Sequence, residues 1–216
     1  MSVEEELSRL PSYSQELGLD LTRPEDRARW FLASILFAKR ISAKVAKNTY
    51  HRFEKEGFDT PEKILAAGWD RLVEVLDSGG YVRYDFSTAT HLLEITEYLK
   101  ATYGNLEEVH RQSTSPADLE RRLGTMRGIG PVGVNIFLRE LRGIWEKADP
   151  RPSQAAATVA RKVGVVNVKL YESALVRVHL EYCKRRRCTE CPVEPYCQGK
   201  SIGPDATDEA ASLLNK

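Results

Sequence analysis

All four cysteines of this 216-residue chain lie in one short stretch near its C-terminus, with the spacing Cys183-x4-Cys188-x2-Cys191-x5-Cys197. Four thiolates this close together can surround a zinc ion or hold the irons of a cubane iron–sulfur cluster. The N-terminal residues are acidic and polar, unlike a secretory signal, so disulfide bonds are not expected. We predict a metal centre at these cysteines: a [4Fe-4S] cluster, with zinc as the alternative.

Four successive cations fill the gap between the first two cysteines: Lys184, Arg185, Arg186 and Arg187. A run of charges is usually a solvated surface. Here a metal centre would hold the short loop rigid and press its charges against a phosphate backbone. We therefore expect these four side chains to contact DNA.

The bulk composition is that of a soluble globular protein, with 42% hydrophobic and 29% charged residues and a mean hydropathy of −0.42. No run approaches the roughly 18 to 20 apolar residues that span a bilayer. The net charge is only +1, so any nucleic-acid binding must depend on local patches. We expect an intracellular monomer with no membrane partner, cytoplasmic and nucleoid-associated if the source is prokaryotic.

The spacing of apolar residues indicates helices throughout, and runs that alternate as strands do are missing. Thr60 and Ser115 each precede a proline and have the pattern of helix N-caps. The predicted class is all-α, with about ten short helices. Helices are expected over residues 25–40, 42–56, from 60, 69–76, 87–103, 115–123, 132–145, 154–163 and 168–182, and a mobile tail over 201–216.

A glycine-rich turn, Gly128-Ile129-Gly130-Pro131, joins two of these helices. The glycines allow the backbone to turn tightly while Ile129 anchors the turn in the core. The N–H groups at the start of the second helix, helped by its dipole, form a site for a DNA phosphate oxygen. The alternative is an ordinary turn between helices, but the surrounding pattern Leu-x4-Gly-Ile-Gly-Pro-x4-Ile-Phe-Leu favours DNA contact by this segment.

Together, the turn and the cysteine block resemble the endonuclease III/MutY branch of the helix-hairpin-helix DNA glycosylases. The similarity runs from about Trp30 to Cys197: residues 31–40 resemble the early core helix, 128–135 the hairpin, and the cysteines the iron–sulfur loop. The first cysteine gap has four residues, where the family commonly has six.

The resemblance implies two helical lobes with a DNA-binding cleft between them. A six-helix barrel lobe would span residues 28–143, and an iron–sulfur lobe would combine 1–27 with 144–200. Double-stranded DNA with a damaged base would lie in the cleft, and the target nucleotide would be flipped into a pocket.

In that family the essential carboxylate follows the hairpin helix, and Asp149 matches its position. A carboxylate there can stabilise an oxocarbenium-like sugar and orient water. The alternative is that Asp149 caps the next helix, because an Asp before Pro150 is held extended. The family often has Thr or Ser and then His after this Asp, whereas this chain has Pro150 and Arg151.

Three further positions are suggested by the resemblance. Bifunctional members have a nucleophilic lysine where this chain has Val132, so the chain is expected to lack the lysine-dependent lyase step. Lys39 aligns near a position that fills the gap left by the flipped base, where it would contact the orphan base or a phosphate; the alternative is that it serves as a displaced nucleophile. Tyr81 lies in the loop that wedges into the duplex, where it would stack on a base unless it simply packs in the core.

The resulting hypothesis is a monofunctional DNA repair glycosylase that excises a damaged or mispaired base by hydrolysing its N-glycosidic bond. The alternatives are a catalytically silent DNA-binding protein and a DNA-binding protein whose affinity responds to the redox state of the cluster.

Overall fold

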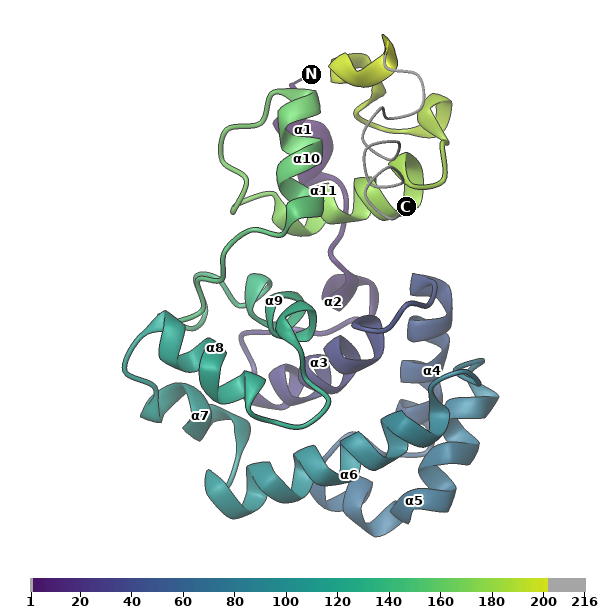
Figure 1. The fold of residues 1–216 in the computed structure, drawn as a ribbon, viewed down its shortest axis with the longest axis vertical. Helices are drawn as coiled ribbons and strands as arrows, with labels where there is room; N and C mark the ends of the chain where they lie inside the picture. Colours follow the sequence, from purple (N-terminus) through teal and green to yellow (C-terminus); the bar gives the residue numbers. More distant parts are fainter. Residues whose placement is uncertain (1, 202–216) are drawn as a thin grey trace, which may run out of the picture. The chain divides into compact units, whose positions relative to one another are not determined.

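The computed structural model describes residues 2–201, with side chains up to Gly199, so the predicted tail over 201–216 lies outside the described residues apart from the backbone of Ser201. Every regular element in the described part is a helix, which confirms the all-α class (Figure 1). The chain divides into two compact units. The large unit is residues 11–152; the cysteine unit is residues 1–10 together with the chain from residue 153 onward.

The large unit packs its helices around one apolar core. Trp30, Ala33 and Leu36 on α3 have no exposed surface, as expected for a helix that is apolar on all sides. The longest helices, α5 and α6, lie side by side (Figure 1). The helices are α2 (Tyr13–Glu16), α3 (Pro24–Phe37), α4 (Ala43–Lys55), α5 (Pro61–Ser78), α6 (Asp85–Thr102), α7 (Leu106–Gln112), α8 (Pro116–Gly124) and α9 (Pro131–Arg139).

Local capping signals set the starts of several of these helices. The Thr60 hydroxyl accepts from Lys63 N–H at the start of α5, with Pro61 in the first turn, as predicted. Ser115 caps α8 in the same way. Gly68 has a left-handed φ of 72° inside α5, so the predicted break before Trp69 is present as a kink.

The cysteine unit is built from shorter helices around a smaller core. The buried side chains of this core are valine, alanine and leucine. Its elements are α1 (Val3–Ser8), α10 (Gln154–Val163), α11 (Glu172–Val178), a π-helical turn (His179–Cys183) and 3-10 turns at Cys188–Glu190, Glu194–Tyr196 and Gln198–Ser201.

The boundaries between the two units differ from those predicted. The large unit was expected to span residues 28–143, and it spans residues 11–152. Residues 11–27 and 144–152 belong to the large unit. Tyr13 stacks on Phe37 with ring centroids 4.7 Å apart, and Trp145 meets Phe137 edge-on at 5.5 Å. These contacts tie residues near both predicted boundaries to the core of the large unit, whereas the family resemblance had placed them in the other lobe.

Several helix ends also differ from the prediction. The helix expected over 132–145 ends at Arg139, and that expected from 168 begins at Glu172. Short helices α1, α2 and α7 were not predicted, because each is too short to show clear apolar periodicity. None of the helices within residues 2–201 combines the length and apolar character that crossing a bilayer requires.

Candidate DNA-binding hairpin, carboxylate and cysteine cluster

The predicted hairpin is a tight turn between α8 and α9, two helices that pack against each other (Figure 1). Gly128 has a left-handed φ of 92°, and a Cβ atom at this position would lie 2.5 Å from Cγ of His91. Both the backbone conformation and the close approach therefore require glycine. Ile129 is buried, as predicted, and its N–H donates to the Met126 carbonyl at 3.0 Å.

Helix α9 begins directly after this turn. Gly130 is its N-cap and has no side chain that could occupy the first-turn amides, which lack partners inside a helix. Val132, in the same turn, is 63% exposed. The amide-rich helix start predicted to bind a phosphate is therefore an exposed part of the large unit.

Lys39 lies at the same hairpin. It follows Ala38, the C-cap of α3, and a Cβ atom on Gly133 of α9 would be 3.5 Å from Cβ of Ala38. Burial lowers the pKa of His91, and the positive charges of Lys39 and Arg127 lower it further. Lys39, His91 and the hairpin are thus close enough to influence one another.

Tyr81 lies in the core and not at a DNA-facing surface. Its side chain has no exposed area, and its hydroxyl donates to the Leu36 carbonyl at 2.9 Å. Burial raises the pKa of this hydroxyl well above its usual range. Tyr81 therefore packs in the core, which was the alternative to stacking on a base. The large apolar side chains exposed near it are Val82, at 62%, and Phe86, at 60%.

Asp149 lies in the large unit, on the segment that leaves the α9 region. Its carboxylate is about half exposed, and Oδ1 is 3.7 Å from Nε of Arg142. Two hydrogen bonds hold the backbone that follows it: Arg142 Nη2 to the Pro150 carbonyl at 2.7 Å and Asn135 Nδ2 to the Arg151 carbonyl at 3.1 Å. The segment is therefore held against the loop after α9 and against α9 itself.

Asp149 does not cap the next helix, which was the alternative role expected for it. The next helix, α10, starts at Gln154, and its N-cap is Ser153, whose hydroxyl accepts from Ala156 N–H at 3.3 Å. Asp149 lies several residues before this cap. Its carboxylate is therefore not used to start a helix.

Two side chains near Asp149 escaped the sequence analysis. Arg142 is its cationic neighbour, and Glu120 on α8 is close enough for the negative charge of Asp149 to raise its pKa, in addition to the larger effect of burial. Neither residue lies in a recognisable motif. The sequence indicated only that Glu120 belongs to the helix before the hairpin.

The loop that carries Asp149 lines an open pocket of about 470 Å³. It is lined by Arg142, Asp149 and the intervening residues 143–146 and 148. A charged pair therefore borders an open space in the large unit.

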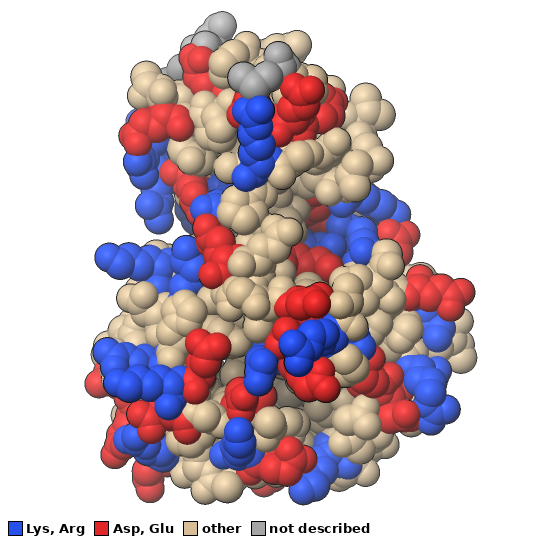
Figure 2. Space-filling view, turned by 180° about the vertical axis from the view of Figure 1, so that it is seen from behind, with Lys and Arg blue, Asp and Glu red and all other residues tan. Residues whose placement is uncertain are grey.

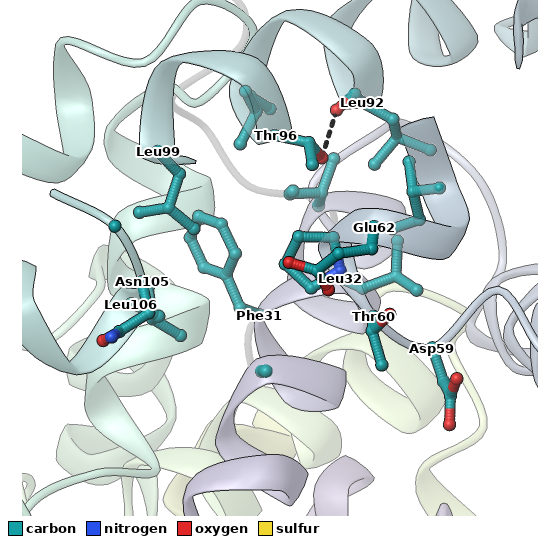
Figure 3. A pocket seen from close by; sticks show the side chains of 16 residues that line it. Phe31, Leu32, Asp59, Thr60, Glu62, Leu92, Thr96, Leu99, Asn105 and Leu106 are labelled. Carbon is teal, nitrogen blue, oxygen red and sulfur yellow. Dashed lines mark hydrogen bonds between the residues drawn. The ribbon is translucent and has the colours of Figure 1, made fainter. Parts of the chain in front are cut away.

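An apolar cavity of about 290 Å³ lies elsewhere in the large unit (Figure 3). Phe31, Leu32 and Leu99 surround it, and Figure 3 shows the Asp59 carboxylate at its rim pointing away. That carboxylate already binds Arg29 and Lys63. None of the predicted site residues lines this cavity.

The cysteine unit brings its four cysteines together. Cys183 ends the π-helical turn, and the charges of the other cysteines act on the thiol of Cys191, so the four sulfurs are near one another. Cys183, Cys191 and Cys197 pack against the core of the unit, whereas Cys188 is exposed. Burial raises the pKa of the Cys183 and Cys191 thiols.

The donor set fits an iron–sulfur cluster or a zinc ion in its chemistry, because it is all thiol and three of its four members are partly shielded from water. Within residues 2–201, no three His, Cys, Asp or Glu side chains already converge as the ligands of a single ion do. The four cysteines therefore fit a metal centre by their residue type and by their closeness in the chain.

The four predicted cations between the first two cysteines are all exposed, but they are not equivalent. Arg187 forms an ion pair with Glu190, with Nε to Oε1 at 2.8 Å. Arg186 has a left-handed φ of 55°, which is unusual for a residue with a side chain. Lys184, Arg185 and Arg186 thus remain the cations best suited to a phosphate contact.

Away from the cysteine loop, positively and negatively charged side chains are interspersed on the surface. On the face shown in Figure 2, Lys and Arg side chains alternate with Asp and Glu over the surface, in agreement with a net charge of +1. No protein-family model and no curated protein matches this chain. The glycosylase resemblance therefore stays a prediction from the motifs.

Proposed function

We propose that this protein is a DNA N-glycosylase that removes a damaged or mispaired base by hydrolysis. The observation that carries the proposal is the setting of Asp149. It is an exposed carboxylate beside an arginine, it follows the hairpin helix, and it is not used as a helix cap. Cleavage of a glycosidic bond needs a carboxylate in such a place, to stabilise the positive charge that develops on the sugar.

The other residues have supporting roles in this proposal. The amides that follow Gly130 hold a phosphate oxygen and position the duplex without reading its sequence. Lys39, beside the hairpin, contacts a phosphate or the orphan base. Because the exposed Val132 cannot form a Schiff base, the product is an abasic site in an uncut strand.

We also propose that Cys183, Cys188, Cys191 and Cys197 hold a [4Fe-4S] cluster in the complete protein. When bound, the cluster supplies a cross-link that fixes the cysteine loop. Lys184, Arg185 and Arg186 then present their charges to DNA from a rigid loop, which lowers the entropy lost on binding. Broad visible absorbance of anaerobically purified protein is expected, and a colourless protein with stoichiometric zinc would contradict this assignment.

The experiment that tests the activity is a panel of duplexes that carry alkylated, deaminated, oxidised or mispaired bases. Each is incubated with the protein and then treated with alkali, which cuts the strand at abasic sites. We expect breaks that depend on alkali on at least one duplex. Asp149→Asn should lower the rate about 10²- to 10³-fold, as the loss of one preorganised electrostatic group does.

The matched control is Asp70→Asn, which changes an exposed carboxylate of the same unit away from the hairpin and should keep the full rate. Binding to every duplex without release of any base would contradict a glycosylase. That outcome would leave the catalytically silent DNA-binding protein as the better description, and a change of affinity with the redox state of the cluster would favour the redox-responsive one.

A further inference from the structure

The apolar cavity of about 290 Å³ in the large unit has no part in the proposed function. It lies between α3, the start of α5, α6 and the start of α7 (Figure 3). Its apolar walls are formed mainly by the buried side chains Phe31, Leu32, Leu92, Ile95, Leu99 and Leu106. Protein interiors are close-packed and leave few spaces larger than a water molecule, so a cavity of this size calls for an explanation.

Most polar groups of the walls already have partners within the protein. The Thr96 hydroxyl donates to the Leu92 carbonyl at 2.6 Å, and the Asp59 carboxylate binds Arg29 and Lys63 (Figure 3). Among the described residues, none of the buried side-chain nitrogen and oxygen atoms of these walls lacks a hydrogen bond. Ordered water needs several polar partners, whereas apolar cavities stay dry and take up apolar molecules. The cavity is therefore suited to an apolar molecule.

The volume limits the size of this molecule. An apolar cavity of about 150 Å³ holds one benzene molecule. Pockets for drug-sized ligands begin at about 300 Å³. The cavity of about 290 Å³ lies at that lower limit and is large enough for two fused rings or a short alkyl chain.

One charged group at the mouth of the cavity differs from its neighbour. Glu62, in the first turn of α5, is exposed, and in Figure 3 its side chain extends towards the cavity. Within residues 2–201 its carboxylate forms neither an ion pair nor a hydrogen bond. The neighbouring carboxylate of Asp59, by contrast, has two cationic partners. The uncompensated charge at the mouth is therefore negative, which favours a cation and disfavours an anion.

We propose that this cavity binds a small apolar cation, an amine whose rings or alkyl chain fill the cavity while its ammonium group lies beside Glu62. Removal of apolar surface from water supplies most of the affinity, and the charge selects among ligands of the same shape. The inference does not depend on the glycosylase function, because none of the residues assigned to that function lines the cavity.

Three probes of similar shape test the proposal on the full chain: naphthalen-2-ylmethylamine, the neutral naphthalen-2-ylmethanol and the anion 2-naphthoate. Each is titrated at neutral pH into isotopically labelled protein, and the NMR methyl signals of leucine and isoleucine report binding. We expect saturable shifts at Ile95 and Leu99, with affinity falling from the amine to the alcohol to the anion. The proposal is overturned if the amine shifts none of the cavity signals, or if 2-naphthoate binds as tightly as the amine.

The role of the charge is tested with Glu62→Gln, an exposed change that should not disturb folding. The variant should bind the alcohol as the wild type does and the amine about two- to five-fold more weakly, the range for one exposed ion pair. Glu25→Gln is the matched control, because Glu25 is an exposed carboxylate in the first turn of α3 and does not line the cavity. An amine affinity that Glu62→Gln leaves unchanged overturns the assignment of a cation.

The role of the cavity is tested by filling it. Ala28 of α3 is half-buried in its wall, so Ala28→Phe should place a ring in the space and abolish binding of the amine and the alcohol. Ala66→Phe, at an exposed position of α5 outside the wall, is the control and should keep both affinities. Unchanged binding by folded Ala28→Phe overturns the site. If that variant does not fold, the wild-type shifts decide, because shifts confined to signals outside the cavity also overturn it.

Discussion

The two units of this protein hold their shape by different means. The large unit buries Trp30, Tyr50, Phe53, Tyr81 and Phe137 nearly completely, together with many leucines. The core of the cysteine unit consists of valine, alanine and leucine side chains, with half-buried cysteines packed against it. Aromatic side chains each bury far more apolar area than alanine or valine. The folded state of the large unit can therefore be stabilised by packing alone. The cysteine unit buries less apolar area, so a metal cross-link is expected to add more to its stability.

This difference also separates the two kinds of candidate site. The hairpin and Asp149 are positioned by packed helices and by hydrogen bonds to the backbone. The cations of the cysteine loop are positioned by short turns that end at thiols. We expect that metal removal and changes of packing affect the two units unequally.

The largest effect is expected from removal of one metal ligand. Cys191→Ser should abolish the centre and unfold the cysteine unit, because structural metal sites in small domains contribute on the order of 10 kcal/mol to folding. Hydrogen exchange followed by mass spectrometry should show loss of protection in α10 and α11 while α3 stays protected. Thr189→Ala, an exposed residue of the same loop, is the control and should exchange like the wild type. Full protection of α10 in Cys191→Ser would mean that packing alone holds this unit.

A smaller effect, confined to the large unit, is expected from Gly128→Ala. The new Cβ atom would lie 2.5 Å from Cγ of His91, and the left-handed backbone is strained for alanine. We expect the free energy of unfolding to fall by about 1 to 3 kcal/mol in urea denaturation. The fluorescence of Trp30, Trp69 and Trp145 reports this transition, because all three tryptophans belong to the large unit.

The control for the hairpin change is Gly124→Ala on α8, where a Cβ atom meets no atom within 4 Å. Alanine there should leave stability unchanged or raise it by up to about 1 kcal/mol. Equal losses in the two variants would show that the hairpin is not as tightly packed as the structure indicates. The cysteine unit should keep its exchange protection in both.

The smallest effect is expected from acid. Burial lowers the pKa of His91 and of His110 in the large unit below the ordinary 6.5. The unfolded chain then binds more protons than the folded one, so stability is complete above pH 6.5 and falls as the pH drops below it. The loss should be about 1 kcal/mol or less, because both rings keep partial contact with water.

Urea denaturation above and below this pH measures the effect, again by tryptophan fluorescence. His91→Asn should remove part of the pH dependence. Stability of the large unit that rises on acidification would contradict the direction of both shifts. Burial also lowers the pKa of His179, so the cysteine unit should lose stability in the same direction.

The features that the sequence alone determined depend on residues close together in the chain. The caps Thr60 and Ser115, the turn at Gly128 and the bounds of α10 were all predictable, because a cap or a turn forms its hydrogen bonds within a few residues. The four cysteines were also predictable as a group, because they lie within fifteen residues of one another in the chain. An all-helical class was predictable because the apolar period is a property of each segment.

Only the tertiary structure decided the features that depend on distant partners. Tyr81 packs in the core because Leu36 offers its carbonyl, and residues 11–27 join the large unit in part because Tyr13 meets Phe37. The charge of Asp149 acts on Glu120 of α8 only in the folded chain, because the two residues are 29 positions apart in the sequence. No local pattern carries this information, since burial and the approach of two charges exist only once the helices have packed.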